Sequence, residues 1–352
     1  MTRAQAQFVI KRLAGVFASA ICLTMLVFYL TNLPPSLDKL ARNQVHNRMA
    51  ETEVSSWLAR NGYDRPFLVR YGEWIGMWPG WSRVDDEGRV TGRCVRVAPP
   101  GGEVPRYCGV LQGDFGHSTL FNEPVTAFLP KRLALTGTLM FWVFALMIPT
   151  ALTLGILAGI REGSRTDRAI SIFSITTAST PEYVSGVVLI TVFASSAVGL
   201  RWFKGSAASA MEAPTFENFF LPVLTIALYG VGYVARMTRA SMADVMTSRY
   251  IQSARLAGLP FSRIVLRHAL RNALITPFTV IMLQIPWLLT GNVVVETLFN
   301  YKGFGWSLFQ AASNNDIELL MACSLVAVLL VLLTQFLSDI AYIYLNPRIR
   351  LT

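Results

Sequence analysis

The most informative chemical feature of this chain is a cluster of arginines in one short stretch, and not a set of catalytic side chains. Seven arginines fall between Arg236 and Arg271, within a helix-forming segment that separates two long apolar stretches. A charged side chain costs about 2.5–3.5 kcal/mol at the centre of a bilayer, so this segment cannot lie within a membrane. It must be an aqueous loop.

Small and apolar side chains recur at helical spacing within this loop. The predicted apolar face consists of Met246, Tyr250, Ala254 and Ala257. Gly258 suits the end of that helix, and Pro260 suits the first turn of the next one. The loop is therefore predicted to form a helix, a sharp turn and a second helix, with small side chains that let another surface come close.

At these residues the chain resembles the inner-membrane permease subunits of bacterial ABC importers, whose cytoplasmic "EAA" loop carries a coupling helix that sits in a groove of the ATPase. The matching positions are Tyr250, Ala254, Arg255, Gly258, Leu259, Arg267, His268, Asn272 and, with one extra residue of spacing, Pro277. Gln252 and Ser253 stand where the general motif has Glu and Ala, as is usual for the peptide branch. The resemblance implies that the ATPase-coupling residues are Tyr250, Ser253, Ala254, Arg255, Ala257, Gly258 and Leu259. The alternative is an ordinary amphipathic loop on the lipid surface.

The composition indicates a membrane protein. Hydrophobic residues make up 53% of the 352 residues and charged residues only 15%, which is too apolar for a soluble protein of this size. A helix needs about 20 residues to cross the hydrocarbon core. We therefore expect an all-α polytopic membrane protein with six transmembrane helices, at about 8–31, 133–160, 169–200, 219–235, 274–298 and 319–345. Polar residues around Pro181 predict a broken or kinked third helix.

The positions of Lys and Arg predict the orientation. Among the tails and short loops, they are concentrated in the N-terminal tail, in residues 161–168, in the loop with seven arginines and in the C-terminal tail at Arg348 and Arg350. Residues 32–132 hold thirteen more, but a segment of that length crosses the membrane largely regardless of its charge. The positive-inside rule then places both termini and the coupling loop in the cytoplasm. The resemblance implies that the membrane is a bacterial inner membrane. The same rule explains much of the formal charge of +10, which therefore requires no nucleic acid. The first apolar run is longer than the apolar region of a signal peptide and is expected to be an uncleaved anchor.

Three regions follow from this topology. Residues 1–31 form the cytoplasmic tail and first helix, 32–132 a long periplasmic region, and 133–352 a five-helix permease core with the coupling loop at 236–273. Cys94 and Cys108 both fall in the periplasmic region, where an oxidising environment favours a disulfide; the alternative is two free thiols. Aromatic residues between Trp57 and Trp81 could pack a small core there or line a peptide route.

Two acidic residues lie close to the proposed path. Glu182 directly follows Pro181 and could line the route or cap the helix that restarts there. Asn292, Glu296 and Phe299 belong to a run from Gly291 to Gly305 that resembles a segment of the peptide permeases. The resemblance implies a position at the external gate, and the alternative is a re-entrant turn that seals the bundle. The segment from Gly113 to Ser118 and the later Ala311 and Asp316 also look like that family.

No Gly-x-x-x-x-Gly-Lys-Ser/Thr loop and no His-Glu-x-x-His pair occurs in the sequence, so we expect no catalysis, cofactor or metal in this chain. The resemblance implies a permease subunit of an ATP-driven importer for oligopeptides or dipeptides. The implied partners are a homologous second permease, two ATP-binding subunits that hold ATP and Mg²⁺, a periplasmic solute-binding protein and membrane lipid. The alternatives are the same machinery serving nickel, opines or oligosaccharides, and an ion-coupled secondary transporter.

Overall fold

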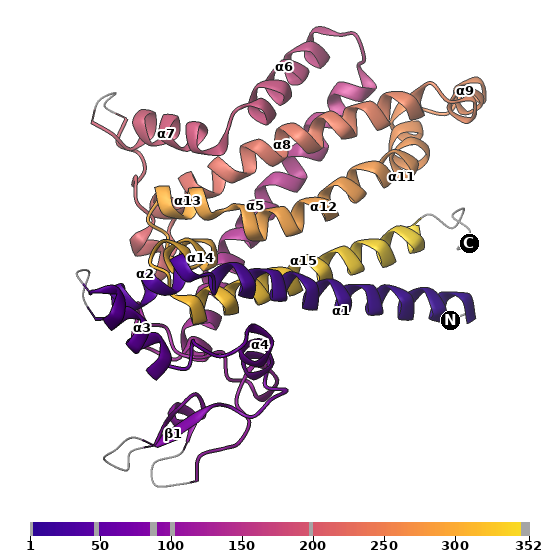
Figure 1. Cartoon of the computed structure of the whole chain (residues 1–352). Helices are drawn as coiled ribbons and strands as arrows, with labels where there is room; N and C mark the ends of the chain where they lie inside the picture. Colours follow the sequence, from indigo (N-terminus) through magenta and orange to yellow (C-terminus); the bar gives the residue numbers. More distant parts are fainter. Residues whose placement is uncertain (1–2, 46–48, 85–89, 99–102, 197–199, 346–352) are drawn as a thin grey trace. The chain divides into compact units, whose positions relative to one another are not determined.

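The computed structural model describes residues 3–45, 49–84, 90–98, 103–196 and 200–345, and most of them are helical (Figure 1). Among these residues, four helices are long and apolar enough to cross a membrane. They are α1 (Arg3–Thr31), α5 (Val125–Ile160), α8 (Phe216–Met246) and α15 (Ile317–Leu345). The expectation of a helical protein with apolar spans is confirmed. Arg348 and Arg350 lie outside the described residues.

The other two expected spans are each divided into two helices. The third consists of α6 (Arg165–Ser179) and α7 (Glu182–Phe193), and the fifth of α12 (Ile275–Gly291) and α13 (Val293–Leu298). Thr180 has an extended ψ of 123°, because the ring of the following Pro181 disfavours helical backbone in the residue before it. The predicted break in the third span is therefore present. A count of six spans stays a prediction, because these helices are short.

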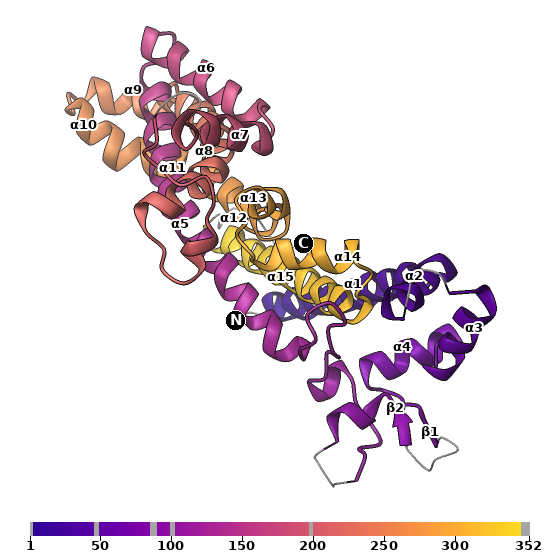
Figure 2. The ribbon, with the colours of Figure 1, turned by 90° about the vertical axis from the view of Figure 1, so that its left-hand side faces the viewer.

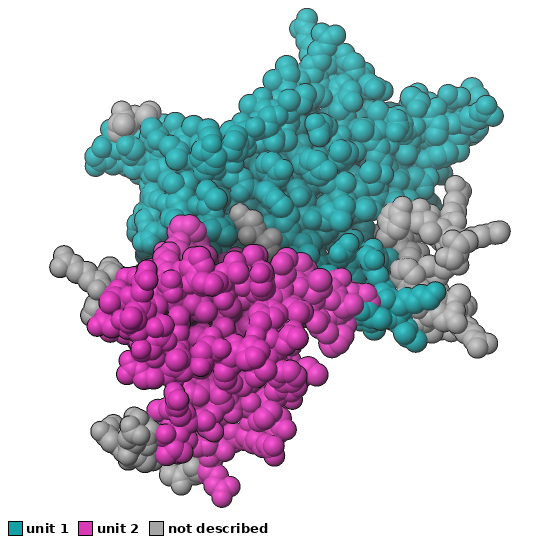
Figure 3. Space-filling model, in the orientation of Figure 1, with its two compact units in different colours: residues 1–14, 134–306, 330–352 teal, residues 15–133, 307–329 magenta. Residues whose placement is uncertain are grey.

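The chain divides into two compact units (Figure 3). Unit 1 contains residues 1–14, 134–306 and 330–352, and unit 2 contains residues 15–133 and 307–329. Contacts between residues define these units, whereas the expected boundaries at residues 31 and 132 rest on membrane topology. Those boundaries accordingly stay a prediction.

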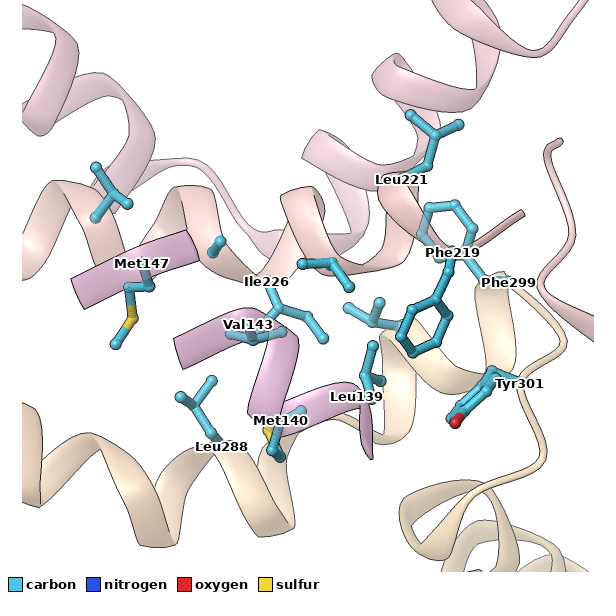
Figure 4. Packing of buried hydrophobic residues seen from close by; sticks show 14 of the residues in the cluster. Leu139, Met140, Val143, Met147, Phe219, Leu221, Ile226, Leu288, Phe299 and Tyr301 are labelled. Carbon is cyan, nitrogen blue, oxygen red and sulfur yellow. The ribbon is translucent and has the colours of Figure 1, made fainter. Parts of the chain in front are cut away.

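In unit 1, α6, α7 and α12 all pack against α8. A core between α5, α8, α12 and the α13 region contains Leu139, Met147, Ile226, Leu288 and Phe299, each fully buried (Figure 4). Wherever such a core is surrounded by lipid, its stability comes from close packing rather than from removal of apolar surface from water. This unit also contains η3 (Ala208–Met211), the short helices of the coupling loop, and parts of α1, α14 (Phe304–Ser313) and α15.

Two glycines let α5 and α8 approach closely. A Cβ atom at Gly159 would lie 2.6 Å from the Cβ of Met242, and one at Gly155 would collide with Thr238. The two glycines are four residues apart and therefore share one face of α5. This is the small-xxx-small pattern of membrane helix pairs, a signal in the sequence that would have predicted the contact.

Unit 2 contains three short helices and a hairpin, which are grouped in Figure 2. They are α2 (Pro34–Gln44), α3 (Glu51–Arg60), α4 (Phe67–Ile75) and the antiparallel strands β1 (Ser82–Val84) and β2 (Val90–Gly92), followed by the 3₁₀ turns η1 (Cys94–Val97) and η2 (Val110–Gln112). Phe28, Tyr71 and Trp74 are buried in one cluster of this unit. The hydroxyl of Tyr71 lies 2.9 Å from that of Thr24 in α1. The aromatic residues of this region thus pack a small core, which is one of the two alternatives above.

Candidate functional site: the coupling loop and buried carboxylates

The loop after α8 folds into a series of short helices. These are α9 (Arg249–Leu256), α10 (Phe261–Arg263), the π-helical turn η4 (Ile264–Ala269) and α11 (Leu270–Ala273). Gly258 has a φ of +74°, a left-handed conformation that an L side chain rarely adopts. Glycine is therefore needed where α9 ends, and the loop has the predicted order of helix, turn and helix.

The face through which α9 packs differs from the predicted apolar face. Ile251 is fully buried, whereas Tyr250 is 42% exposed and Ala257 is also exposed. The reason is that Met246 is the last residue of α8, and the extended backbone of Ser248 separates it from α9. The helical spacing counted from Met246 does not continue across that break. Sequence reasoning missed Ile251, although Ser248 is a typical helix-start residue and could have revealed the new helix.

Ile251 anchors α9 to a local core in unit 1. Buried neighbours in that core include Met242 of α8 and Ile264 of η4, and Ala254 and Leu259 are partly buried against it. The side-chain amide of Asn272 donates a hydrogen bond to the Tyr250 hydroxyl at 2.9 Å. This hydrogen bond links the first turn of α9 to α11, which leads into α12.

Apart from the buried Ile251 and the half-buried Ala254, all of α9 and the turn to Gly258 are exposed. Ser253, Arg255 and Gly258 are all exposed, and Leu256 between them is 90% exposed. Phe261 and Leu266 of the following segment are 53% and 69% exposed. Large apolar side chains held out from a basic loop suit contact with another protein surface. Sequence reasoning counted the small residues of this surface but missed these three large ones.

An ion pair lies beside the same end of α8. The guanidinium of Arg239 donates through Nη2 to Oδ2 of Asp167 at 2.8 Å and through Nε to Oδ1, and Glu162 lies 3.8 Å away. Asp167 is only 3% exposed and also accepts a hydrogen bond from the backbone of Gly163 at 2.9 Å. The hydrogen bonds from Arg239 lower the pKa of Asp167 to about 2. The pair ties the first turn of α6 to the helix that enters the coupling loop.

Glu296 of α13 is fully buried and its carboxylate is satisfied within unit 1. It accepts hydrogen bonds from the Thr136 hydroxyl at 2.5 Å and from the backbone of Trp306 at 2.8 Å. Thr136 in turn accepts from the backbone of Phe304 at 2.7 Å. A Cβ atom at Gly303 would collide with both Thr136 and Glu296. This network attaches α5 to the turn after α13.

The predicted gate residues are brought near each other but are not on the surface of the chain. Asn292 is 1% exposed, and Glu296 and Phe299 are fully buried. Buried side chains of this kind can support a gate through packing. Their role at the gate stays a prediction.

Glu182 lies in the first turn of α7, after Pro181. Its Oε1 atom is buried and has no hydrogen-bond partner among the described residues. A buried carboxylate oxygen without a donor is costly unless a partner or water supplies one. The position of Glu182 in the first turn of α7 agrees with a helix-start residue, and its role in the path stays a prediction.

Two motifs that are far apart in the sequence meet in unit 2. The Ser118 hydroxyl donates to the buried carboxylate of Asp316 at 2.6 Å, and the backbone of Leu120 donates to the same oxygen at 3.1 Å. Asp316 also accepts from the backbone of Leu319 at 3.2 Å, which caps the start of α15. Sequence reasoning noted the segment ending at Ser118 and the later Asp316 separately, without predicting that they pair.

Cys94 and Cys108 form a disulfide with their Cα atoms 5.4 Å apart, so the predicted bridge is confirmed. No cluster of three or more His, Cys, Asp or Glu suited to a metal ion occurs within the part of the chain that the structure describes.

Residues 151–351 match the model of a family described as "binding-protein-dependent transport system inner membrane component". A Brucella ovis protein provisionally named a peptide permease is 26% identical over 98% of this chain and 99% of its own length. A glutathione transport system permease from Salmonella choleraesuis is 29% identical over 97% of this chain and 98% of its own.

A Sinorhizobium fredii protein named a probable peptide ABC transporter permease is 32% identical over 68% of this chain and 77% of its own length. A solved amino acid ABC transporter with histidines aligns with 60% of this chain and 91% of its own, at 14% identity and a TM-score of 0.45.

Proposed function

The chain belongs to the family of binding-protein-dependent transport inner-membrane components and is a permease subunit of an ABC importer. On that premise, we propose that it imports peptides and that α9 transmits movements of the ATPase subunits to the membrane helices. The observation that supports the coupling role is the exposed surface of α9 and its turn. Leu256 is held 90% exposed on a helix whose other side is anchored by the buried Ile251.

In this mechanism, two ATPase subunits bound to ATP approach each other and push α9, which sits on one of them. Because Ile251 and its neighbours bind α9 to the end of α8, the push moves α8 and the helices packed against it. The transporter then exchanges inward-facing and outward-facing states, which have different affinities for solute. The ion pair of Asp167 with Arg239 would carry the same motion to α6.

A pore between two permeases requires a second, homologous subunit. The complete importer therefore consists of this chain, a related permease, two ATP-binding subunits and a periplasmic binding protein. Both termini and the coupling loop lie in the cytoplasm, in agreement with the distribution of Lys and Arg in the short loops and tails. The region around 32–132 lies in the periplasm, in agreement with a disulfide between Cys94 and Cys108. ATP and Mg²⁺ are bound by the ATPase subunits.

Peptides are proposed as the solute because two of the relatives are named peptide permeases and another is named a permease for glutathione, itself a small peptide. Nickel, opines and oligosaccharides are not favoured by these names. Uptake of a labelled dipeptide by cells with and without this chain tests the assignment, with a labelled sugar as the control solute.

The coupling role is tested by Leu256→Glu. We expect the variant to reach the membrane at the normal level but to recover at least about tenfold less ATPase subunit on purification, since a carboxylate replaces a central apolar contact. The control is Leu111→Glu, which makes the same change at another exposed leucine, 67% exposed, in unit 2. We expect it to retain the ATPases. Normal recovery with Leu256→Glu, or equal loss with both variants, would contradict the proposed coupling surface.

A further inference from the structure

Unit 2 contains a cavity of about 570 Å³ that the transport mechanism above does not use. All of its lining residues belong to unit 2, from the end of α1, from α2, from the region 57–126 and from the first turns of α15. Aromatic rings form much of the wall, from Phe28, Trp57, Tyr63, Trp74 and Trp81. A cavity of this size and lining is typical of sites for small molecules.

Four arginines and three carboxylates also line the cavity, and two of the arginines form close hydrogen bonds within unit 2. Arg65 forms a two-point ion pair with Glu73, with its Nη2 donating at 2.6 Å. Arg70 donates to the backbone oxygen of Tyr63 at 3.1 Å and to the side chain of Asn32, and its guanidinium lies over the Tyr63 ring. Burial raises the pKa of Tyr63 to about 12, so this phenol stays neutral and adds no negative charge.

The other two arginines share one weak partner. Arg93 and Arg96 each place an Nη1 atom 3.9 Å from the carboxylate of Glu318, beyond the usual length of a charge-assisted hydrogen bond. That carboxylate already accepts a hydrogen bond from the backbone of His117 at 2.6 Å. The positive charges of Arg93 and Arg96 therefore face the single negative charge of Glu318, which also accepts the hydrogen bond from His117.

Two buried donors of the cavity wall have no acceptor among the described residues. They are Nε of Arg93 and Nε1 of Trp74, and Trp74 is only 3% exposed. Buried N–H groups in folded proteins nearly always have a partner, so this pair indicates that an acceptor enters the cavity. Anions are the acceptors that a guanidinium binds most strongly.

We infer that this cavity binds a small organic carboxylate carrying an aromatic or other apolar group, with its carboxylate at Arg93 and Arg96 and its apolar part against the ring-lined wall. The ligand is a free small molecule of the periplasm. Asp114, which also lines the cavity, would disfavour ligands with two acidic groups.

The disulfide holds this site in place. Arg93 immediately precedes Cys94, the first residue of η1, and Arg96 lies within the same turn. The backbone of Arg93 donates to that of Trp81 at 3.0 Å, which fixes the turn to the strand pair. Gly80 lies so close to the sulfur of Cys94 that no side chain fits between them. The turn with both arginines is thus fastened on two sides.

The inference is tested by isothermal titration of the full chain in detergent with N-acetylphenylalanine. We expect saturable binding with a dissociation constant of about 1 mM or lower, and binding weaker by at least about tenfold for the neutral amide of the same compound, which lacks the ionic acceptor. Acetate supplies the carboxylate without the ring and should also bind at least about tenfold more weakly. Absence of saturable binding, or equal binding of the acid and the amide, would overturn the inference.

The residue assignment is tested with Arg93→Gln. We expect its affinity for N-acetylphenylalanine to fall at least about tenfold, whereas Arg83→Gln on β1, which does not line the cavity, should bind as the unchanged chain does. Retention of the Cys94–Cys108 bridge verifies the fold of each variant. If Arg93→Gln fails that control, Arg96→Gln decides instead. Full affinity in a folded variant would overturn the assignment.

These results are independent of the importer role. The cavity takes no part in recovery of the ATPase subunits, so loss of binding would leave the proposed coupling surface intact. A chain that binds the carboxylate but recovers no ATPases would support the cavity site and contradict the proposed coupling surface.

Discussion

At the scale of single residues, the carboxylates of this chain differ in what their surroundings do to them. Asp167 is buried against a guanidinium, Glu296 is buried among a hydroxyl and backbone amides, and Glu182 has one oxygen without a partner among the described residues. Buried carboxylates that are fully hydrogen-bonded serve structure, because their charge or proton has no solvent to exchange with. Asp167 and Glu296 are of this kind in the described conformation.

Asp167→Asn is expected to destabilise the solubilised chain by about 2.5 kcal/mol at pH 7, the free energy that corresponds to lowering the pKa of Asp167 from about 4 to about 2. The carboxylate contributes its full stabilisation above its pKa in the unfolded chain, near 4. That contribution is lost as the pH falls toward 2, where the folded-state carboxylate is protonated too.

Thermal unfolding in detergent from pH 8 to pH 2 checks this. The difference between the two proteins should be constant down to about pH 5 and shrink below it. Asp244→Asn, at an exposed carboxylate on the same α8, is the control. Equal stability of the two variants at pH 7 would show that the ion pair contributes nothing measurable.

At the scale of helices, close contact between α5 and α8 depends on two side chains being absent. Gly155 and Gly159 let the helices meet without intervening atoms, where packing rather than removal from water provides the attraction. The breaks in the third and fifth spans are also properties of elements. Pro181 ends α6 for a local steric reason, and α12 ends at Gly291, just before Asn292 and α13.

Gly155→Leu is expected to destabilise the chain by about 1–3 kcal/mol, as overpacking of a close contact usually does. Its Cβ atom would lie 2.6 Å from the backbone oxygen of Ala235 in α8 and would collide with Thr238. Gly137→Leu on the same α5 has nothing within 4 Å of its Cβ and serves as the control. The melting temperatures of the two variants in detergent decide; if Gly155→Leu melts no lower than Gly137→Leu, the two helices do not need this contact.

At the scale of the whole molecule, the two units are stabilised by different means. Unit 1 has an extended apolar core, whereas unit 2 combines an aromatic cluster, the Asp316 hydrogen bonds and one disulfide. The coupling loop belongs to unit 1 and the arginine-lined cavity to unit 2. Damage to unit 2 should therefore leave coupling intact.

The double variant Cys94→Ser, Cys108→Ser tests that separation. Loss of the bridge, which joins residues 14 apart, should destabilise unit 2 by about 3 kcal/mol and speed proteolysis between residues 90 and 110. Recovery of ATPase subunits should not change. Cys22→Ser, at a free thiol, is the control for loss of a sulfur. Loss of the ATPases together with the bridge would mean that the units are energetically coupled.

The sequence by itself determined the helical membrane class, the break before Pro181, the glycine turn at the end of α9 and the pairing of Cys94 with Cys108. Each depends on a local rule or on composition, such as proline sterics, a left-handed glycine, the length of an apolar run, or two cysteines in one oxidising compartment. Such rules need no knowledge of distant neighbours.

Only the tertiary structure decided which side chains share a space. It buried Ile251 and exposed Tyr250, because a break at Ser248 shifted the helical spacing. Arg239 joins Asp167 across 72 residues, and Ser118 joins Asp316 across 198. Neither pairing has a signature in spacing, since a hydrogen bond is set by where packed elements place two side chains and not by their separation along the chain.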